Sequence, residues 1–158
     1  MYKIAEQAGY QTVLIESPEE KTLAELLAPS LRQIALKLDL IEGKKEKSRK
    51  VMSALRSFAS AFKVNIGDRG FGVEPSHGTA DSGVIDRDLI DLLVAVGEAA
   101  AEAKGGVALF IDELQYVEER ELGALIAGIH RVGQLNLPLV VFGAGLPQFA
   151  GHTGKARS

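Results

Sequence analysis

The chain has 158 residues, of which 46% are hydrophobic, and a formal net charge of −3. This size and composition suit one globular domain with a substantial core. The slight acidic excess gives no overall attraction to nucleic acid, and the absence of cysteine excludes zinc sites built on thiolates.

Neither a membrane span nor a targeting segment is recognisable. The longest uncharged apolar runs, 107–111 and 137–146, are far shorter than the ~20 residues that a membrane-spanning helix needs. Residues 1–10 lack the basic start and the small-residue cleavage site of a signal peptide. We therefore expect a cytoplasmic protein with no membrane partner.

The N-terminal residues combine a helical pattern with a strand pattern. Apolar positions within residues 1–8, followed by Gly9, indicate the last turns of a helix. The β-branched and apolar run 11–15 predicts a short buried strand.

The next segment favours a long helix. Ser17 precedes Pro18 and two acidic residues, which suits a helix N-terminus with Ser17 as its cap. An apolar stripe continues from there to Leu38. Because proline removes a backbone hydrogen bond, we expect either a kink just before Pro29 or a new helical segment just after it.

A polar and mostly basic run covers residues 42–50. Its simplest interpretation is a solvated loop that leads into another helix, whose apolar positions continue to Phe62. The alternative is contact with nucleic acid or with a partner through its cations, Lys44, Lys45, Lys47, Arg49 and Lys50. Beyond it, residues 63–66 and 71–74 alternate around two glycines and predict a β-hairpin.

The second half alternates helices and strands. Asp86 and Asp88 stand at the start of a helical run, 89–103, where the helix dipole favours acidic residues. An apolar strand, a helix over 118–134 and a strand over 139–142 follow. Continuous apolar strands that alternate with helices predict an α/β fold with a parallel sheet covered on both faces.

The apolar run that begins at Gly106 ends abruptly in two adjacent carboxylates, Asp112 and Glu113. This is the pattern of a Walker B strand, in which the first carboxylate helps to hold Mg²⁺ beside the nucleotide phosphates and the second can polarise the attacking water. An apolar strand can also end in charged residues simply because strand ends reach water. The phosphate-binding loop G-x-x-x-x-G-K-[ST] does not occur in the 158 residues.

The chain resembles bacterial ATP-binding proteins of the AAA type, which are related to origin-recognition and STAND-like ATPases. The resemblance lies in residues 8–16, 106–116 and 137–147. It implies a P-loop NTPase-like parallel sheet flanked by helices, with a small β-hairpin insertion. It also implies that residues 1–158 form a partial domain, without the Walker A loop upstream and the lid downstream.

The same resemblance implies ATP and Mg²⁺ as cofactors of the full-length protein. Asp112 would orient the magnesium shell through water, and Glu113 would be the general base. Residues 139–144 take the sensor-1 place, yet 142–145 offer no Asn, Ser or Thr to reach a γ-phosphate. At the position of Glu16 and Ser17, related ATPases keep a polar residue that can restrain the catalytic glutamate. The role of Ser17 as a helix cap, however, explains this residue fully.

Without the phosphate loop, we expect this chain to be catalytically inactive alone. The strand that normally precedes the loop is also missing, so an exposed hydrophobic edge favours self-association. Two alternatives remain open. One is a non-catalytic protein-interaction module with a degenerate NTPase fold, and the other is a DNA-binding adaptor that uses the basic residues of 44–50.

Overall fold

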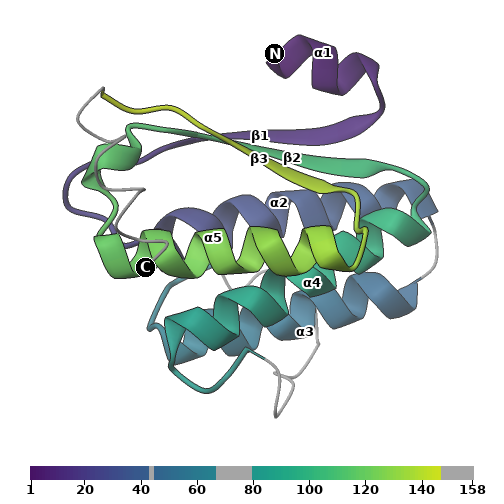
Figure 1. The fold of residues 1–158 in the computed structure, drawn as a ribbon. Coiled ribbons are helices and arrows are strands. Elements are labelled where there is room, and N and C mark those ends of the chain that lie inside the picture. Colours follow the sequence, from purple (N-terminus) through teal and green to yellow (C-terminus); the bar gives the residue numbers. More distant parts are fainter. Residues whose placement is uncertain (43–44, 67–79, 147–158) are drawn as a thin grey trace.

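A computed structural model describes residues 1–42, 45–66 and 80–146 (Figure 1). The fold is α/β, with a three-stranded parallel sheet in the order β1-β2-β3 and flanking helices. The elements are α1 (Tyr2–Gln7), β1 (Tyr10–Glu16), α2 (Leu23–Glu42), α3 (Lys45–Ala61), α4 (Ile85–Glu102), β2 (Gly106–Asp112), the 3₁₀ turn η1 (Leu114–Tyr116), α5 (Glu119–Gln134) and β3 (Leu139–Gly143).

The strand β2 occupies the centre of the sheet. Its register with β1 pairs Gly106 with Tyr10 and Asp112 with Glu16, and its register with β3 pairs Val107 with Leu139. All three strands run in the same direction, so their carboxyl ends meet at one edge of the sheet. The three strands predicted for the parallel sheet are confirmed, with ends that differ by one residue at most from the expected ones in β1 and β3.

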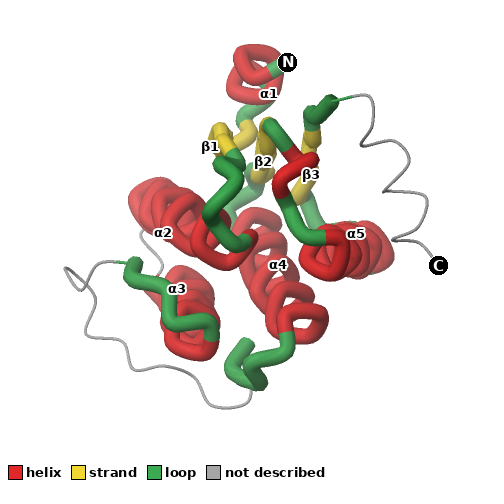
Figure 2. The backbone as a smooth tube through the Cα atoms, turned by 90° about the vertical axis from the view of Figure 1, so that its left-hand side faces the viewer, coloured by secondary structure: helices red, strands yellow, loops and turns green. Residues whose placement is uncertain are grey.

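The helices lie mainly on one side of the sheet. Figures 1 and 2 show α2, α4 and α5 beneath one face, with α3 packed farther out against α2 and α4. The apolar stripes of these helices meet the sheet in one core, whose largest fully buried side chains include Leu27, Leu31, Phe58, Leu92, Leu109 and Leu125. The amphipathic patterns predicted for these helices explain this layer.

The opposite face of the sheet carries only α1 among the described elements (Figure 2). The row Leu14, Phe110 and Phe142 runs across that face in register, and the rings of Phe110 and Phe142 stack with centroids 4.7 Å apart. Tyr2 of α1 contacts Phe110, but Leu14 remains 59% exposed. Full cover of both faces, expected from the sequence, is therefore not found within the described part of the chain.

The helix predicted from Ser17 begins later, at Leu23. Its N-terminus is a capping box: the Glu25 backbone N–H donates to Thr22 Oγ1 at 3.3 Å, and the Thr22 N–H donates to the Glu25 carboxylate at 2.8 Å. The prediction of Ser17 as the cap was wrong, because this reciprocal pair satisfies the helix start instead. Pro29 lies inside the continuous helix α2, so a separate segment after it was also wrong.

Most of the basic run is helical, since α3 already begins at Lys45. The expectation of a solvated loop through residue 50 was therefore wrong for residues 45–50. Residues 63–66 form no strand. The rest of the predicted hairpin, residues 67–74, lies outside the described residues, as does Lys44.

Candidate functional site

An open pocket of about 650 Å³ lies at the carboxyl edge of the sheet. The ends of β1 and β2 and the turns that follow them form its walls. It is lined by Glu16, Ser17, Pro18, Lys21, Asp112, Glu113 and Tyr116. Three carboxylates face one lysine there, so the local charge favours a cation or a ligand that arrives with one.

Both predicted site residues belong to this pocket. Asp112 is the last residue of the central strand, and Glu113 is the first residue after it; both are exposed. Asp112 Oδ1 accepts the backbone N–H of Glu113 at 2.8 Å. The structure thus brings the two carboxylates to the strand end that the sequence indicated, together with Glu16 of the neighbouring strand.

The backbone of Glu113 adopts a left-handed conformation, with φ 59° and ψ 36°. A non-glycine residue in this region costs on the order of 1–2 kcal/mol. The hydrogen bond from its N–H to Asp112 and the 3₁₀ turn that begins at Leu114 hold it there. Nothing in the sequence signals this conformation, because glutamate has no preference for it.

The pocket also includes Ser17, whose side chain was assigned to a helix cap by the sequence. Ser17 is 1% exposed, and its backbone N–H donates to the carbonyl of Asp112 at 3.2 Å. Its hydroxyl has no hydrogen-bond partner among the residues that the structure describes. A buried hydroxyl without a partner is uncommon and calls for a ligand, water or ion.

The turn after β2 is joined to the segment after β3. The backbone N–H of Leu114 donates to Ala144 at 3.0 Å, and that of Ala144 donates to Ile111 at 2.9 Å. Between the two segments, Gln115 donates to the Glu113 carboxylate through Nε2 and accepts the Leu146 backbone N–H through Oε1 at 3.2 Å. No sequence pattern indicates a role for Gln115, because its link to Leu146 arises only in the tertiary structure.

The donor set fits magnesium held largely through water. Within residues 1–42, 45–66 and 80–146, no three His, Cys, Asp or Glu side chains gather into a metal cage. Mg²⁺ keeps several of its waters and commonly uses one or two carboxylates. The exposed Asp112 carboxylate, which lines the pocket, suits such a shell, and Ser17, whose hydroxyl is buried and unpartnered, belongs to the same lining.

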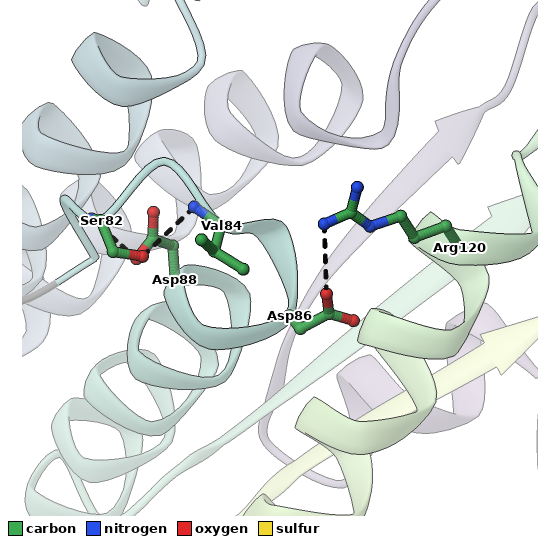
Figure 3. A network of polar contacts seen from close by, with 5 residues as sticks. All are labelled: Ser82, Val84, Asp86, Asp88 and Arg120. Atoms are coloured by element: carbon green, nitrogen blue, oxygen red, sulfur yellow. Dashed lines mark hydrogen bonds and ion pairs between the residues drawn. The ribbon is translucent and has the colours of Figure 1, made fainter.

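Asp86 and Asp88 have structural roles at the start of α4, as predicted (Figure 3). Asp88 is fully buried and accepts hydrogen bonds from the Ser82 N–H, the Ser82 hydroxyl and the Gly83 N–H at 3.0, 2.6 and 2.7 Å. Asp86 is exposed and pairs with Arg120 at 3.7 Å. Asp88 therefore organises the turn before α4, and Asp86 contributes an exposed ion pair to α5.

The basic run is described only in part. Arg49 and Lys50 are exposed on α3. Lys50 borders an open pocket of about 690 Å³ between α3, α4 and α5, where Arg87 and Arg131 accompany two acids, Asp91 and Glu98. This mixture of charges forms no continuous basic surface, and the side chains of residues 44–48 lie outside the description.

No protein-family model, curated protein or solved structure matches the chain. In the described residues, no helix has the length and apolar character needed to cross a membrane.

Proposed function

We propose that this chain is part of an AAA-type ATPase and provides the Walker B half of its Mg-nucleotide site. The observation that carries the proposal is the position of Asp112 and Glu113. They stand at the carboxyl end of the central strand of a parallel sheet and line an open pocket. In open α/β sheets, ligands bind outside the carboxyl ends of the strands.

In this proposal, Asp112 holds the hydration shell of Mg²⁺, and Glu113 takes a proton from the attacking water. Magnesium would neutralise charge on the phosphates, which the three carboxylates of the pocket would otherwise repel. Phosphate contacts of the kind a glycine-rich loop provides are absent from the sequence. In this proposal the full-length protein would bind and hydrolyse ATP. This chain alone would bind ATP weakly, because it lacks such a loop.

A second candidate is a non-catalytic protein-interaction module. It is favoured by the apolar row of Leu14, Phe110 and Phe142, on the face that α1 alone covers within the part of the chain that the structure describes. Exposed apolar patches commonly mark contact surfaces. The DNA-binding alternative has less support. Lys50 of the basic run lines a pocket in which acidic side chains lie beside it.

The test is calorimetric titration of Mg-ATP into this chain and into a longer chain that carries a glycine-rich phosphate loop upstream. We expect binding by the longer chain, and the substitution Asp112→Asn should weaken it at least tenfold. Asp86→Asn is the matched control, because Asp86 is an exposed carboxylate that does not line the pocket and pairs with Arg120 instead. If the longer chain binds no Mg-ATP, or if Asp112→Asn and Asp86→Asn behave alike, the interaction module becomes the better account.

A further inference from the structure

The side chain of Gln115 connects its own turn to Leu146, which lies 31 positions later in the chain. Its Nε2 donates to Oε2 of Glu113, and its Oε1 accepts the backbone N–H of Leu146 at 3.2 Å. An amide side chain is suited to this double contact because it offers a donor and an acceptor on one rigid plane. Gln115 itself is half-buried within the 3₁₀ turn η1, which limits its freedom to rearrange.

The two segments are also fixed to each other by their backbones. Leu114 donates to Ala144, and Ala144 donates to Ile111 at the end of β2. Gly143 allows this close approach, because a Cβ at that position would collide with the side chain of Leu114. The segment after β3 therefore rests directly on the turn that contains Glu113.

The end of β3 has no polar side chain that could form a hydrogen bond with a ligand, since residues 142–145 are Phe-Gly-Ala-Gly. Gln115 supplies the missing polar link, but from the neighbouring turn. The left-handed backbone of Glu113 makes this link more important, because a strained residue stays in place only where its surroundings hold it.

We propose that Gln115 is a positioning residue that holds the carboxylate of Glu113 in register with the segment leaving β3, so that the two move together. A ligand that shifts either of them is then sensed by the other. The importance of Glu113 for catalysis rests on the proposed function, whereas the link through Gln115 does not depend on it.

The test measures amide hydrogen exchange at Leu146 and Leu114 by NMR in the complete chain. Gln115→Met keeps the length of the side chain but removes its donor and acceptor. We expect Leu146 exchange to rise roughly tenfold, as the loss of one hydrogen bond allows. Exchange at Leu114, whose bond to Ala144 is between backbones, should change less than twofold. An unchanged Leu146, or an equal rise at Leu114, would show that Gln115 makes no specific link.

Two further variants separate positioning from simple loop stability. Glu113→Ala removes one end of the link and should speed Leu146 exchange severalfold in the wild-type background, but not in the Gln115→Met background. Gln115→Glu keeps an oxygen that can accept the Leu146 N–H, but it cannot donate a hydrogen bond to Glu113. The Leu146 amide should therefore stay protected from exchange, and Glu113→Ala should no longer change its exchange rate. An effect of Glu113→Ala that persists without Gln115 would overturn the proposal.

Addition of MgCl₂ distinguishes the failure of this inference from that of the proposed function. If Mg²⁺ perturbs the amides around Asp112, the Leu146 resonance should move in the wild type and stay in place in Gln115→Met. Perturbation at Asp112 without any response at Leu146 would contradict the inference. Failure of Mg²⁺ to perturb Asp112 would count against the proposed function, while the exchange data would still decide the link.

Discussion

Glu121 on α5 caps the N-terminus of α2, because both its carboxylate oxygens lie 3.2 Å from the backbone nitrogen of Leu23. The two residues are 98 positions apart in the chain. Glu121 therefore joins the helix that follows β1 to the helix that follows β2. The contact lies near the candidate site, because both helices begin just beyond the pocket-lining turns.

The contact makes stability depend on pH. Burial raises the pKa of Glu121 above its ordinary value of 4.5, and the nearby Glu118 and Glu25 raise it further, although the Leu23 N–H opposes this. The folded state then binds a proton more tightly than the unfolded state. The contribution of protonated Glu121 to the stability of the fold is therefore complete below about pH 4.5, and it is lost as the pH rises through the raised pKa.

Glu121→Gln should remove this dependence and keep the cap, because the amide oxygen can still accept the Leu23 N–H. We expect the variant to gain up to about 0.5 kcal/mol over the wild type at pH 7.5, a small value because solvent screens a half-exposed carboxylate. The gain should vanish near pH 4.5. Urea unfolding at several pH values measures it, and a difference that stays constant with pH would contradict the assignment.

Asp88→Ala should be strongly destabilising. The substitution leaves three donors at Ser82 and Gly83 without their buried acceptor, for a loss of about 3 kcal/mol in the free energy of unfolding. The matched control is Asp86→Ala two residues earlier, whose exposed pair with Arg120 contributes about 0.5 kcal/mol or less. Chemical denaturation compares them, and losses of similar size would refute the buried contacts of Asp88, of which Figure 3 shows those with Ser82.

Self-association should use the sheet face that, among the described residues, α1 alone covers. Phe142→Lys places a charge beside Phe110 on that face, and we expect it to shift the chain toward monomer in analytical ultracentrifugation. Leu135→Lys is the control, because Leu135 is similarly exposed (40% against 38%) but lies just after α5. Equal effects of the two substitutions would exclude a specific role for the sheet face.

Elements whose boundaries depend on their own residues could be predicted from the sequence. Predictions failed where a boundary depends on contacts with residues far away in the chain. Strand β2 is a continuous apolar run and α5 has a clear amphipathic stripe, so both were confirmed almost to their ends. The start of α2 was misplaced because Ser17 and Pro18 imitate a helix start. The T-x-x-E signature of Thr22 and Glu25 was present but overlooked, and the second cap, Glu121, comes from another helix.

The features of the candidate site also fall into those that the sequence predicts and those that depend on tertiary packing. The positions of Asp112 and Glu113 at a strand end followed from the pattern, whereas their approach to Glu16 depends on which strands pair and in what register. The left-handed backbone of Glu113 and the Gln115 link to Leu146 could not be predicted, because they depend on how two turns pack together. The burial of the Ser17 hydroxyl without a partner belongs to the same class.

Paramagnetic broadening of amide resonances by Mn²⁺, used as a stand-in for Mg²⁺, tests whether a magnesium site lies at the end of β2. We predict that low Mn²⁺ broadens the amides of Ser17 and Glu113 first, that Mg²⁺ competes, and that Asp112→Asn abolishes this preference. Broadening that is spread evenly over the acidic surface, and is unchanged by Asp112→Asn, would contradict a magnesium site at the end of β2.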